Sequence, residues 1–249
     1  MNLVITGSSS GIGKFLADSL AVKGHAICRL ARSPQDGFGF QCDVSNWPAL
    51  EKCVEKIAAK WEAVDALICC AGVQDPVGPA MEMDPTAWRS NLAVNLDGTF
   101  FSIRAFYSLL CQAQRRAKVI CFSGGGAASP RPNFAAYGVS KTGVVRLVET
   151  LAAEWEKLPL DINAVAPGAI YTRMTEQVLA HGASAAGKAE FERASKQSRD
   201  NATELARVLG LVEFLLSPRS DGISGKCRRW QIIQAFQASA LQELGQTSL

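Results

Sequence analysis

A phenol and an amine lie four residues apart in the segment Tyr137-Gly138-Val139-Ser140-Lys141. On a helix this spacing places both side chains on one face, one turn apart. An ammonium group beside a phenol favours the phenolate, so Lys141 could lower the pKa of Tyr137 from its ordinary value near ~10. Such a phenol can donate a proton to a carbonyl oxygen or accept one from an alcohol. The same spacing is also typical of an ordinary surface pair, so its meaning depends on the rest of the chain.

A glycine-rich turn, Thr6-Gly7-Ser8-Ser9-Ser10-Gly11-Ile12-Gly13, lies between an apolar run and a helical pattern. Glycines at such a junction let the backbone approach a pyrophosphate, and the helix N-terminus supplies free N–H groups and a favourable dipole. A glycine-rich loop without a ligand is the alternative, but the strand before and the helix after favour a dinucleotide. The candidate contacts are Gly7, Ser9, Ser10, Gly11, Ile12 and Gly13.

Short apolar runs alternate with longer helical patterns along the whole chain. The expected strands are Leu3–Thr6, Ala26–Leu30, Phe38–Gln41, Ala66–Cys70, Lys118–Phe122 and Ile162–Val165. The expected helices are Gly13–Lys23, Trp47–Trp61, most of Pro85–Leu110, Tyr137–Leu158 and Asn201–Leu216. This alternation predicts one α/β domain over residues 1–249, with a doubly wound parallel sheet of the Rossmann type between two helical layers. The Ala-, Ser-, Gly- and Lys-rich segment 174–199 falls where a substrate lid is expected.

Composition excludes several other classes of protein. The net charge of +3 over 249 residues is small and no run of like charges concentrates it, which argues against nucleic-acid and membrane-surface partners. No apolar stretch approaches the ~20 residues that span a bilayer, and the N-terminus carries no signal-peptide pattern. Four of the eight cysteines lie in apolar strand-like runs and the chain has two histidines. We therefore expect reduced thiols, a cytoplasmic location, no metal site and a small-molecule substrate.

The glycine turn resembles the T-G-x-x-x-G-x-G motif of the single-domain branch of the short-chain dehydrogenase/reductase family. Further matches follow in order along nearly the whole chain: Asn95, Ser123, the Tyr137–Lys141 pair, and Pro167-Gly168. The resemblance implies hydride transfer between a nicotinamide cofactor and a carbonyl or alcohol. It implies that Tyr137 is the acid/base, and that Lys141 adjusts the pKa of Tyr137 and binds the ribose of the cofactor. It places Asn95 at a disturbance in its helix, in a proton relay with Lys141, and it implies a homodimer or homotetramer.

The resemblance also assigns cofactor contacts and a cofactor preference. Its adenine-contacting pair matches Asp43 and Val44. The other matches are Ala71 and Gly72 after the fourth strand, and Pro167, Gly168, Ile170 and Thr172 beside the nicotinamide. An acidic residue at the end of the second strand would bind the ribose hydroxyls of NAD, whereas an arginine can hold the 2′-phosphate of NADP. The acidic position falls at Ala31 and the basic one at Arg32, with Ser33 as a further donor, so NADP(H) is expected over NAD(H). The alternative for Arg32 is a solvated loop charge.

Three positions depart from the family pattern. In many members the active-site serine lies thirteen residues before the tyrosine, where this chain has Gly124. A one-residue insertion after the strand makes Ser123 the expected serine, and Ser129 is the alternative. Cys70 replaces the asparagine of the N-A-G motif, which we expect to cost stability and not chemistry. The usual last strand is missing, and residues 226–249 form an atypical tail that leaves the oligomer geometry open.

The leading hypothesis is an NADP(H)-dependent carbonyl reductase or alcohol dehydrogenase acting on a secondary alcohol. The alternative is a non-catalytic dinucleotide-binding sensor or scaffold. Such a protein would be expected to lack the tyrosine or the lysine, and this chain has both Tyr137 and Lys141. An epimerase or dehydratase of the family's longer branch would need a larger chain and a different glycine spacing. Segments 74–79, 131–134 and 174–199 are expected to shape the substrate pocket. They mix polar, charged and apolar groups, so the substrate stays open among 3-oxoacyl thioesters, sugars, polyols and cyclic ketones.

Overall fold

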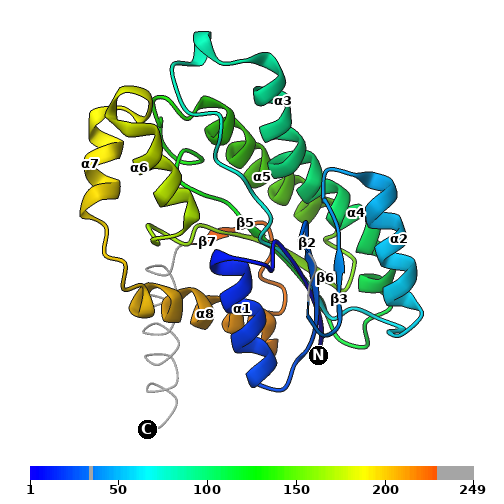
Figure 1. Ribbon diagram of the computed structural model, residues 1–249. Coiled ribbons are helices and arrows are strands. Elements are labelled where there is room, and N and C mark those ends of the chain that lie inside the picture. Colours follow the sequence, from blue (N-terminus) through cyan, green and yellow to red (C-terminus); the bar gives the residue numbers. More distant parts are fainter. Residues whose placement is uncertain (34–35, 229–249) are drawn as a thin grey trace, which may run out of the picture.

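A parallel sheet forms the centre of the protein (Figure 1). The computed structural model describes residues 1–33 and 36–228. The strand order is β3-β2-β1-β4-β5-β6-β7, so the chain moves outward in one direction from β1 to β3 and in the other from β4 to β7. The strands are β1 (Asn2–Thr6), β2 (Ala26–Ala31), β3 (Gly39–Gln41), β4 (Ala66–Cys69), β5 (Ala117–Phe122), β6 (Leu160–Val165) and β7 (Cys227–Arg228).

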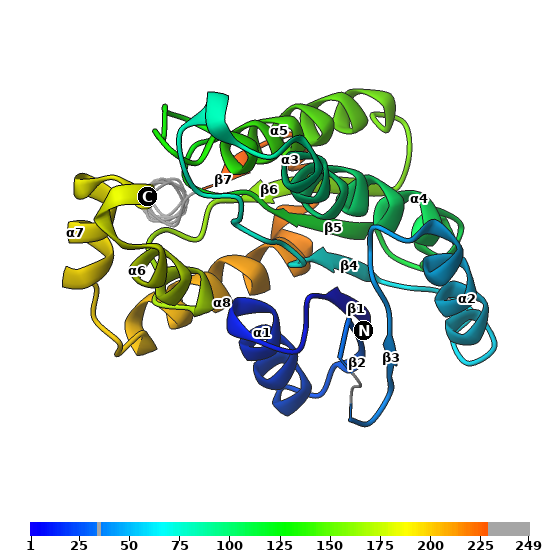
Figure 2. The same ribbon diagram turned by 45° about the horizontal axis from the view of Figure 1, so that its top comes forward.

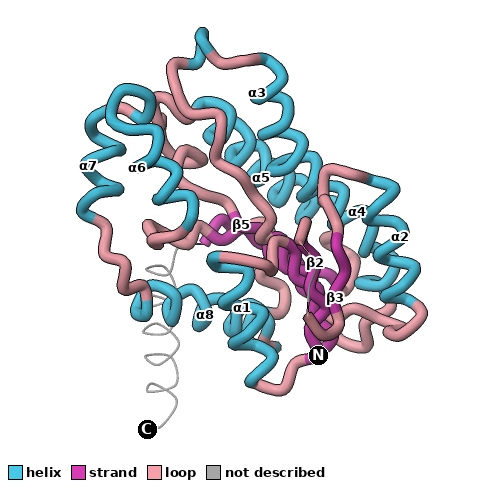
Figure 3. Tube along the Cα trace, in the orientation of Figure 1, coloured by secondary structure: helices cyan, strands magenta, loops and turns pink. Residues whose placement is uncertain are grey.

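Helices cover both faces of this sheet, as the views in Figures 2 and 3 show. One face packs against α2, α4 and α5, and the other against α1 and α8. Successive strand residues serve opposite faces: Val4 belongs to the first core cluster, and Leu3 and Ile5 belong to the second. The helices are α1 (Gly11–Val22), α2 (Trp47–Ala58), α3 (Pro85–Leu92), α4 (Gly98–Cys111), α5 (Ala135–Glu154), α6 (Arg173–Ala186), α7 (Lys188–Lys196) and α8 (Ala202–Leu216). The predicted three-layer α/β fold is confirmed.

Local sequence explains where several helices begin. The Asn46 side chain accepts a hydrogen bond from the backbone of Ala49 at the start of α2, and Asp84 does the same for α3. Thr172 and Thr175 form a reciprocal capping box at α6. Each of these side chains satisfies a backbone N–H that has no partner inside the helix.

Two predictions are corrected by the structure. Segment 174–199 carries no helix prediction, yet it lies almost entirely in α6 and α7. Gly187, with a positive φ angle, joins these two helices, and Gly182, also with a positive φ angle, makes a kink inside α6. The last strand, expected to be missing, exists as the two residues of β7, which pair with Ala164 and Val165 of β6. The remainder of the predicted tail, residues 229–249, lies outside the described residues.

The carboxyl ends of β1, β4, β5 and β6 meet at one edge of the sheet, where the strand order reverses. In open α/β sheets ligands bind in the crevice at this point. The segments that leave these four strands carry the glycine turn, Ala71-Gly72, Ser123 and Pro167-Gly168. The fold therefore gathers the predicted site residues at one edge. Among the described residues, no helix has both the length and the apolar character needed to cross a membrane.

Candidate active site

Two adjoining cavities lie at this edge. The larger, about 680 Å³, contains Tyr137 and Lys141, and the smaller, about 380 Å³, contains the glycine turn. Both are lined by Ile12, Cys70, Gly72, Thr172 and Met174, so they form one continuous depression. The glycine turn and the Tyr137–Lys141 pair, predicted to contact different parts of a dinucleotide, thus lie in adjoining parts of one depression.

The glycine turn is shaped by close backbone packing. Gly7 has φ +68°, and a Cβ built on it would lie 2.6 Å from the backbone nitrogen of Ala71. A Cβ on Gly13 would lie 2.3 Å from the carbonyl oxygen of Gly7. The first turn of α1 holds no acidic residue, and the side chain of Ser10 does not cap it. This helix N-terminus therefore fits the pyrophosphate of a dinucleotide.

The far end of the smaller cavity holds the residues predicted to contact the adenosine half of the cofactor. Arg32 and Ser33 follow β2, are exposed and line this cavity, as does the buried Ala31 at the end of the strand. Asp43 lines the same cavity, and its carboxylate accepts hydrogen bonds from the backbone and hydroxyl of Ser45 at 2.9 and 2.7 Å. Val44 is buried beside it. The structure thus brings this predicted group together around one space, without an acidic side chain at residue 31.

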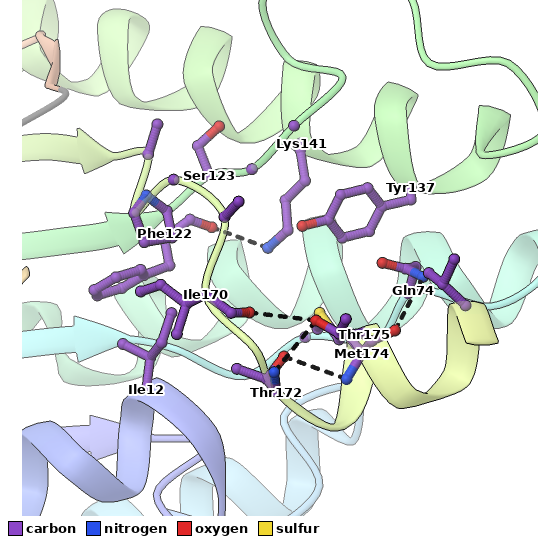
Figure 4. Close-up of a pocket in the computed structure, with 18 of the residues that line it drawn as sticks. Ile12, Gln74, Phe122, Ser123, Tyr137, Lys141, Ile170, Thr172, Met174 and Thr175 are labelled. Atoms are coloured by element: carbon purple, nitrogen blue, oxygen red, sulfur yellow. Dashed lines mark hydrogen bonds between the residues drawn. The ribbon is translucent and has the colours of Figure 1, made fainter. Parts of the chain in front are cut away.

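Tyr137 and Lys141 project from the first turns of α5 into the larger cavity, with the phenol oxygen and the lysine nitrogen directed toward the same space (Figure 4). Lys141 Nζ donates a hydrogen bond to the carbonyl oxygen of Phe122 at 2.9 Å. Both side chains are buried: Tyr137 is 7% and Lys141 4% exposed. A residue pair that looks ordinary in sequence is therefore placed against the end of β5, inside a cavity.

Burial dominates the electrostatics of this pair. It raises the pKa of Tyr137 above its ordinary value, and the nearby positive charge of Arg131 offsets part of that shift. Burial lowers the pKa of Lys141 to about 8, although the thiols of Cys70, Cys121 and Cys69 act in the opposite direction. The pKa of Tyr137 is thus raised where a lowered one was expected, and the charge that opposes the effect of burial is that of Arg131.

Asn95 lies in a single π-helical turn, Ala93–Asp97, between α3 and α4. Its Oδ1 accepts from the backbone of Val73 at 2.9 Å, and its Nδ2 donates to the Val73 carbonyl at 2.8 Å. A Cβ built on Gly72 would lie 3.1 Å from Asn95 Oδ1 and 3.4 Å from Lys141 Nζ, so glycine lets both polar groups flank this position. The predicted disturbance in the helix is present, and Asn95 lies near Lys141.

The geometry around Ser123 differs from the one expected for the active-site serine. The hydroxyl of Ser123 is buried, has no hydrogen-bond partner among the described residues, and points away from Tyr137 (Figure 4). Gly124 faces the phenol instead, since a Cβ built there would lie 2.2 Å from Tyr137 Oη. Ser129 is exposed and does not line the cavity. Ser123 thus lines the larger cavity and Ser129 does not, but the chain turns at Ser123 so that the next residue, and not the serine hydroxyl, approaches the phenol.

The predicted nicotinamide-side loop lies where the two cavities adjoin. Pro167, Gly168 and Ile170 line the larger one, and Thr172 lines both. A Cβ on Gly11 would lie 3.7 Å from Cγ2 of Thr172, so this loop approaches the glycine turn directly. Ile170 O accepts from the hydroxyl of Thr175 at 3.4 Å, which links the loop to α6 (Figure 4).

Sequence reasoning missed the residues that connect these parts. Ser140 Oγ accepts from Asn95 Nδ2 at 3.0 Å and donates to the carbonyl of Tyr137 at 2.8 Å, and so joins the π turn to α5. Asn91 holds the same loop through a 2.7 Å bond to the Asp75 carbonyl. By contrast, Gln74, Arg131 and Glu190 belong to the segments expected to shape the substrate pocket, and they line the larger cavity. The position of Ser140 between Tyr137 and Lys141 was the one available signal, but these contacts join distant segments.

Comparisons with known proteins agree with this geometry. The family model described as short chain dehydrogenase matches residues 1–182. The D-threitol dehydrogenase of Mycolicibacterium smegmatis is 34% identical over 194 residues, covering 69% of this chain and 70% of that protein. A human protein named dehydrogenase/reductase SDR family member 2, mitochondrial, is 30% identical over 237 residues, covering 90% of this chain and 82% of the relative. The aldohexose dehydrogenase of Thermoplasma acidophilum superposes with a TM-score of 0.79 at 23% identity, covering 91% of this chain and 90% of that one.

Proposed function

The chain belongs to the short-chain dehydrogenase family and is an oxidoreductase of carbonyls and alcohols, and on that premise we propose an NADP(H)-dependent enzyme in which Tyr137 is the acid/base. The observation that carries the proposal is the convergence of Tyr137 and Lys141 in a cavity continuous with the pyrophosphate turn. A sensor or scaffold would not need a buried phenol and amine at that place.

The residues divide the work of the reaction as follows. When bound, the reduced nicotinamide supplies the hydride that reaches the carbonyl carbon of the substrate. Tyr137 Oη donates a proton to the carbonyl oxygen, for which its raised pKa keeps it protonated at neutral pH. Lys141 stabilises the resulting phenolate by its charge, and Asn95 and Ser140 fix the α5 backbone beside it. We give Ser123 no part in this step, because its hydroxyl points away from Tyr137.

The preference for NADP(H) rests on the end of β2. Arg32 is exposed on the wall of the smaller cavity beside Ser33, and Ala31 offers no carboxylate to the ribose hydroxyls. A guanidinium group there suits a 2′-phosphate. We assign the remaining cofactor contacts to predicted residues that line the depression: the glycine turn, Asp43, Val44, Ala71, Gly72, Pro167, Gly168, Ile170 and Thr172.

Further proposals concern the substrate lid, the oligomeric state and the cellular location of the protein. We propose that α6 and α7 act as the substrate lid, since both line the larger cavity. A homo-oligomer is supported by Phe100 of α4 and Val139 of α5, which are exposed apolar side chains on one helical layer. A cytoplasmic location is supported by the buried thiols of Cys28, Cys42, Cys53, Cys69 and Cys121, which suit a reducing compartment.

The decisive experiment measures NADPH and NADH oxidation by absorbance against a panel of ketones, with Tyr137→Phe as the matched variant. We expect turnover with at least one ketone, faster with NADPH, and a loss of about 10²-fold or more in Tyr137→Phe. Near-normal turnover by Tyr137→Phe would reject the acid/base role. Equal use of both cofactors by the wild type and by Arg32→Ala would reject the role of Arg32.

A further inference from the structure

The wall of the larger cavity beside Tyr137 carries a group of polar side chains from three separate segments. We define this polar wall as Gln74, Arg131 and Glu190. Gln74 lies in the loop after β4, Arg131 in the loop before α5, and Glu190 on α7. Arg131 Nε and Nη2 donate to Glu190 Oε2 at 3.2 and 3.0 Å, and Arg193 Nη1 donates to Glu190 Oε1 at 2.5 Å. The wall is therefore built around a partly buried ion pair.

The polar wall lies next to the reacting group. The guanidinium carbon of Arg131 is 3.8 Å from the centre of the Phe134 ring and 5.6 Å from that of Tyr137. Gln74 lies on the Tyr137 side of the cavity, beside α6 (Figure 4). A substrate with its carbonyl oxygen at Tyr137 Oη would thus present the adjoining part of its chain to these groups.

The wall keeps hydrogen-bonding capacity that its own contacts do not use. Gln74 is 4% exposed, yet its amide makes contacts of 3.4 Å with the Met174 carbonyl and 3.5 Å with Arg131 Nη1, both at the limit for a hydrogen bond. A carboxylate oxygen can accept two hydrogen bonds and an amide can both donate and accept. Buried polar groups of this kind cost free energy until a partner satisfies them.

The chemistry of the wall distinguishes three classes of substrate. A hydroxyl both donates and accepts, so it can bond to Glu190 and to Arg131 or Gln74 together. A carboxylate on the substrate would be repelled by Glu190, or would have to displace it from Arg131. A long apolar chain would leave the ion pair desolvated and the Gln74 amide without a partner. A neutral chain with several hydroxyl groups satisfies the wall without either cost.

We infer that the substrate is a small neutral polyhydroxylated compound, a polyol or the ketose formed from it, whose hydroxyls beside the reacting carbon bind Gln74, Arg131 and Glu190. This inference rests on the proposed function. In the oxidative direction one secondary alcohol loses its proton to Tyr137 and its hydride to oxidised NADP, and the other hydroxyls are unchanged.

The test compares four-carbon alcohols that differ in hydroxyl number: 2-butanol, 2,3-butanediol and the tetritols threitol and erythritol. Oxidation is followed by NADPH formation for the wild type, Glu190→Gln and Gln74→Leu. We expect kcat/KM to be at least about tenfold higher for one tetritol than for 2-butanol. Each substitution should lower the tetritol value about tenfold or more and change the 2-butanol value less than about threefold.

Glu192→Gln is the matched control, because Glu192 lies on the same helix, is half-exposed and pairs only loosely with Lys188 at 4.0 Å. It should leave all values unchanged. Equal losses for 2-butanol and tetritol in both Glu190→Gln and Gln74→Leu would overturn the inference, since the wall would then only hold the lid. Oxidation of 2-butanol with no gain for any polyol would overturn it and leave the proposed function standing. No turnover of any alcohol or ketone with either nicotinamide would instead reject the proposed function itself. Melting curves identify a variant that fails to fold, and the other variant then decides.

Discussion

Burial sets the protonation of the two reactive side chains in the ligand-free protein. Burial against α5 and the end of β5 excludes solvent from both side chains. It raises the pKa of Tyr137, which favours the phenol, and lowers the pKa of Lys141, which disfavours the ammonium. A protonated phenol suits proton donation to a carbonyl. The reverse reaction needs the phenolate, so the oxidative rate should rise with pH over a range in which the reductive rate does not.

The lowered pKa of Lys141 makes the stability of the fold depend on pH. Its pKa is near 8 when folded and near ~10.4 in an unfolded chain. Between these values the unfolded chain binds more protons, so the contribution of Lys141 to the free energy of unfolding increases as pH rises. We therefore expect Lys141→Met to raise the melting temperature of the ligand-free protein at pH 7, by a margin that shrinks toward pH 9.5. Lys14→Met, at an exposed position, should show no such trend, and a constant margin for Lys141→Met would contradict the argument.

Gly124 limits what can stand beside the phenol. In Gly124→Ala the added Cβ would lie 2.2 Å from Tyr137 Oη and 3.0 Å from Cζ, so Tyr137 must move. We expect kcat to fall about 10²-fold, since misplacement of a reacting group by about 1 Å has that effect. Gly125→Ala is the control, because its Cβ would meet no atom within 4 Å.

Ser123→Ala belongs to the same comparison. Its hydroxyl is unpartnered among the described residues and points away from Tyr137, so kcat should change less than about threefold. A loss comparable to that of Gly124→Ala would show that Ser123 turns toward the substrate during the reaction.

At the scale of elements, the strands bring the site segments to one edge, and the π turn between α3 and α4 ties two of these segments together. The extra residue in the turn directs Asn95 inward, where it bonds to the backbone of Val73 and reaches Ser140 of α5. π-Bulges inside helices are frequent at functional sites. This one joins the loop after β4 to the helix that carries Tyr137 and Lys141.

Asn95→Ala should therefore affect stability and activity together. It leaves the N–H and C=O of Val73 without these partners, at about 1–3 kcal/mol for each buried group. We expect the free energy of unfolding to fall by about 3 kcal/mol in urea titrations, and kcat/KM to fall at least about tenfold. Asn46→Ala, which removes the cap of α2, should cost about 1 kcal/mol and leave kcat/KM unchanged. Equal effects of the two substitutions would argue against a special role for the π turn.

At the scale of the whole molecule, a buried charge network holds the end of the sheet opposite the site. Lys118 of β5 contacts Asp161 of β6 and Asp221, both at 2.7 Å, and Arg116 contacts Asp161 at 3.1 Å. Gly222 also donates its backbone N–H to Asp161 at 3.1 Å. The network fixes the segment that leads from α8 to β7, where the strand pairing itself is short.

Asp161→Asn should destabilise the whole fold. The substitution removes the buried carboxylate that Lys118, Arg116 and the Gly222 N–H share, and it leaves the buried Lys118 with only the half-exposed Asp221 as a partner. Because this remaining pair is partly solvated, we expect a loss at the lower end of the about 3–5 kcal/mol that breaking a buried ion pair costs. Asp18→Asn, which breaks the exposed pairs with Lys14 and Arg29, should cost no more than about 1 kcal/mol. Urea unfolding of both variants checks the difference, and similar small losses would show that Asp161 is not critical.

The sequence alone determined the features that depend on neighbours along the chain. Helical spacing placed Tyr137 and Lys141 on one face of a helix. The role of the first glycine-rich turn could be predicted because the turn lies between a strand and a helix. Period and composition were enough for the doubly wound sheet, because alternating strands and helices permit few arrangements. The helices α6 and α7 escaped prediction because small and polar residues leave little apolar pattern there.

Only the tertiary structure decided which distant groups meet. The link from Asn95 to Ser140 spans 45 residues and the contact from Arg131 to Glu190 spans 59, and neither leaves a periodic pattern in the chain. The direction of the Ser123 hydroxyl likewise depends on how the loop after β5 turns against α5. The sequence was therefore enough to identify Tyr137 and Lys141 as the reactive pair. Which polar side chains contact one another around this pair was decided by the tertiary structure, because such contacts form only when separate segments pack together.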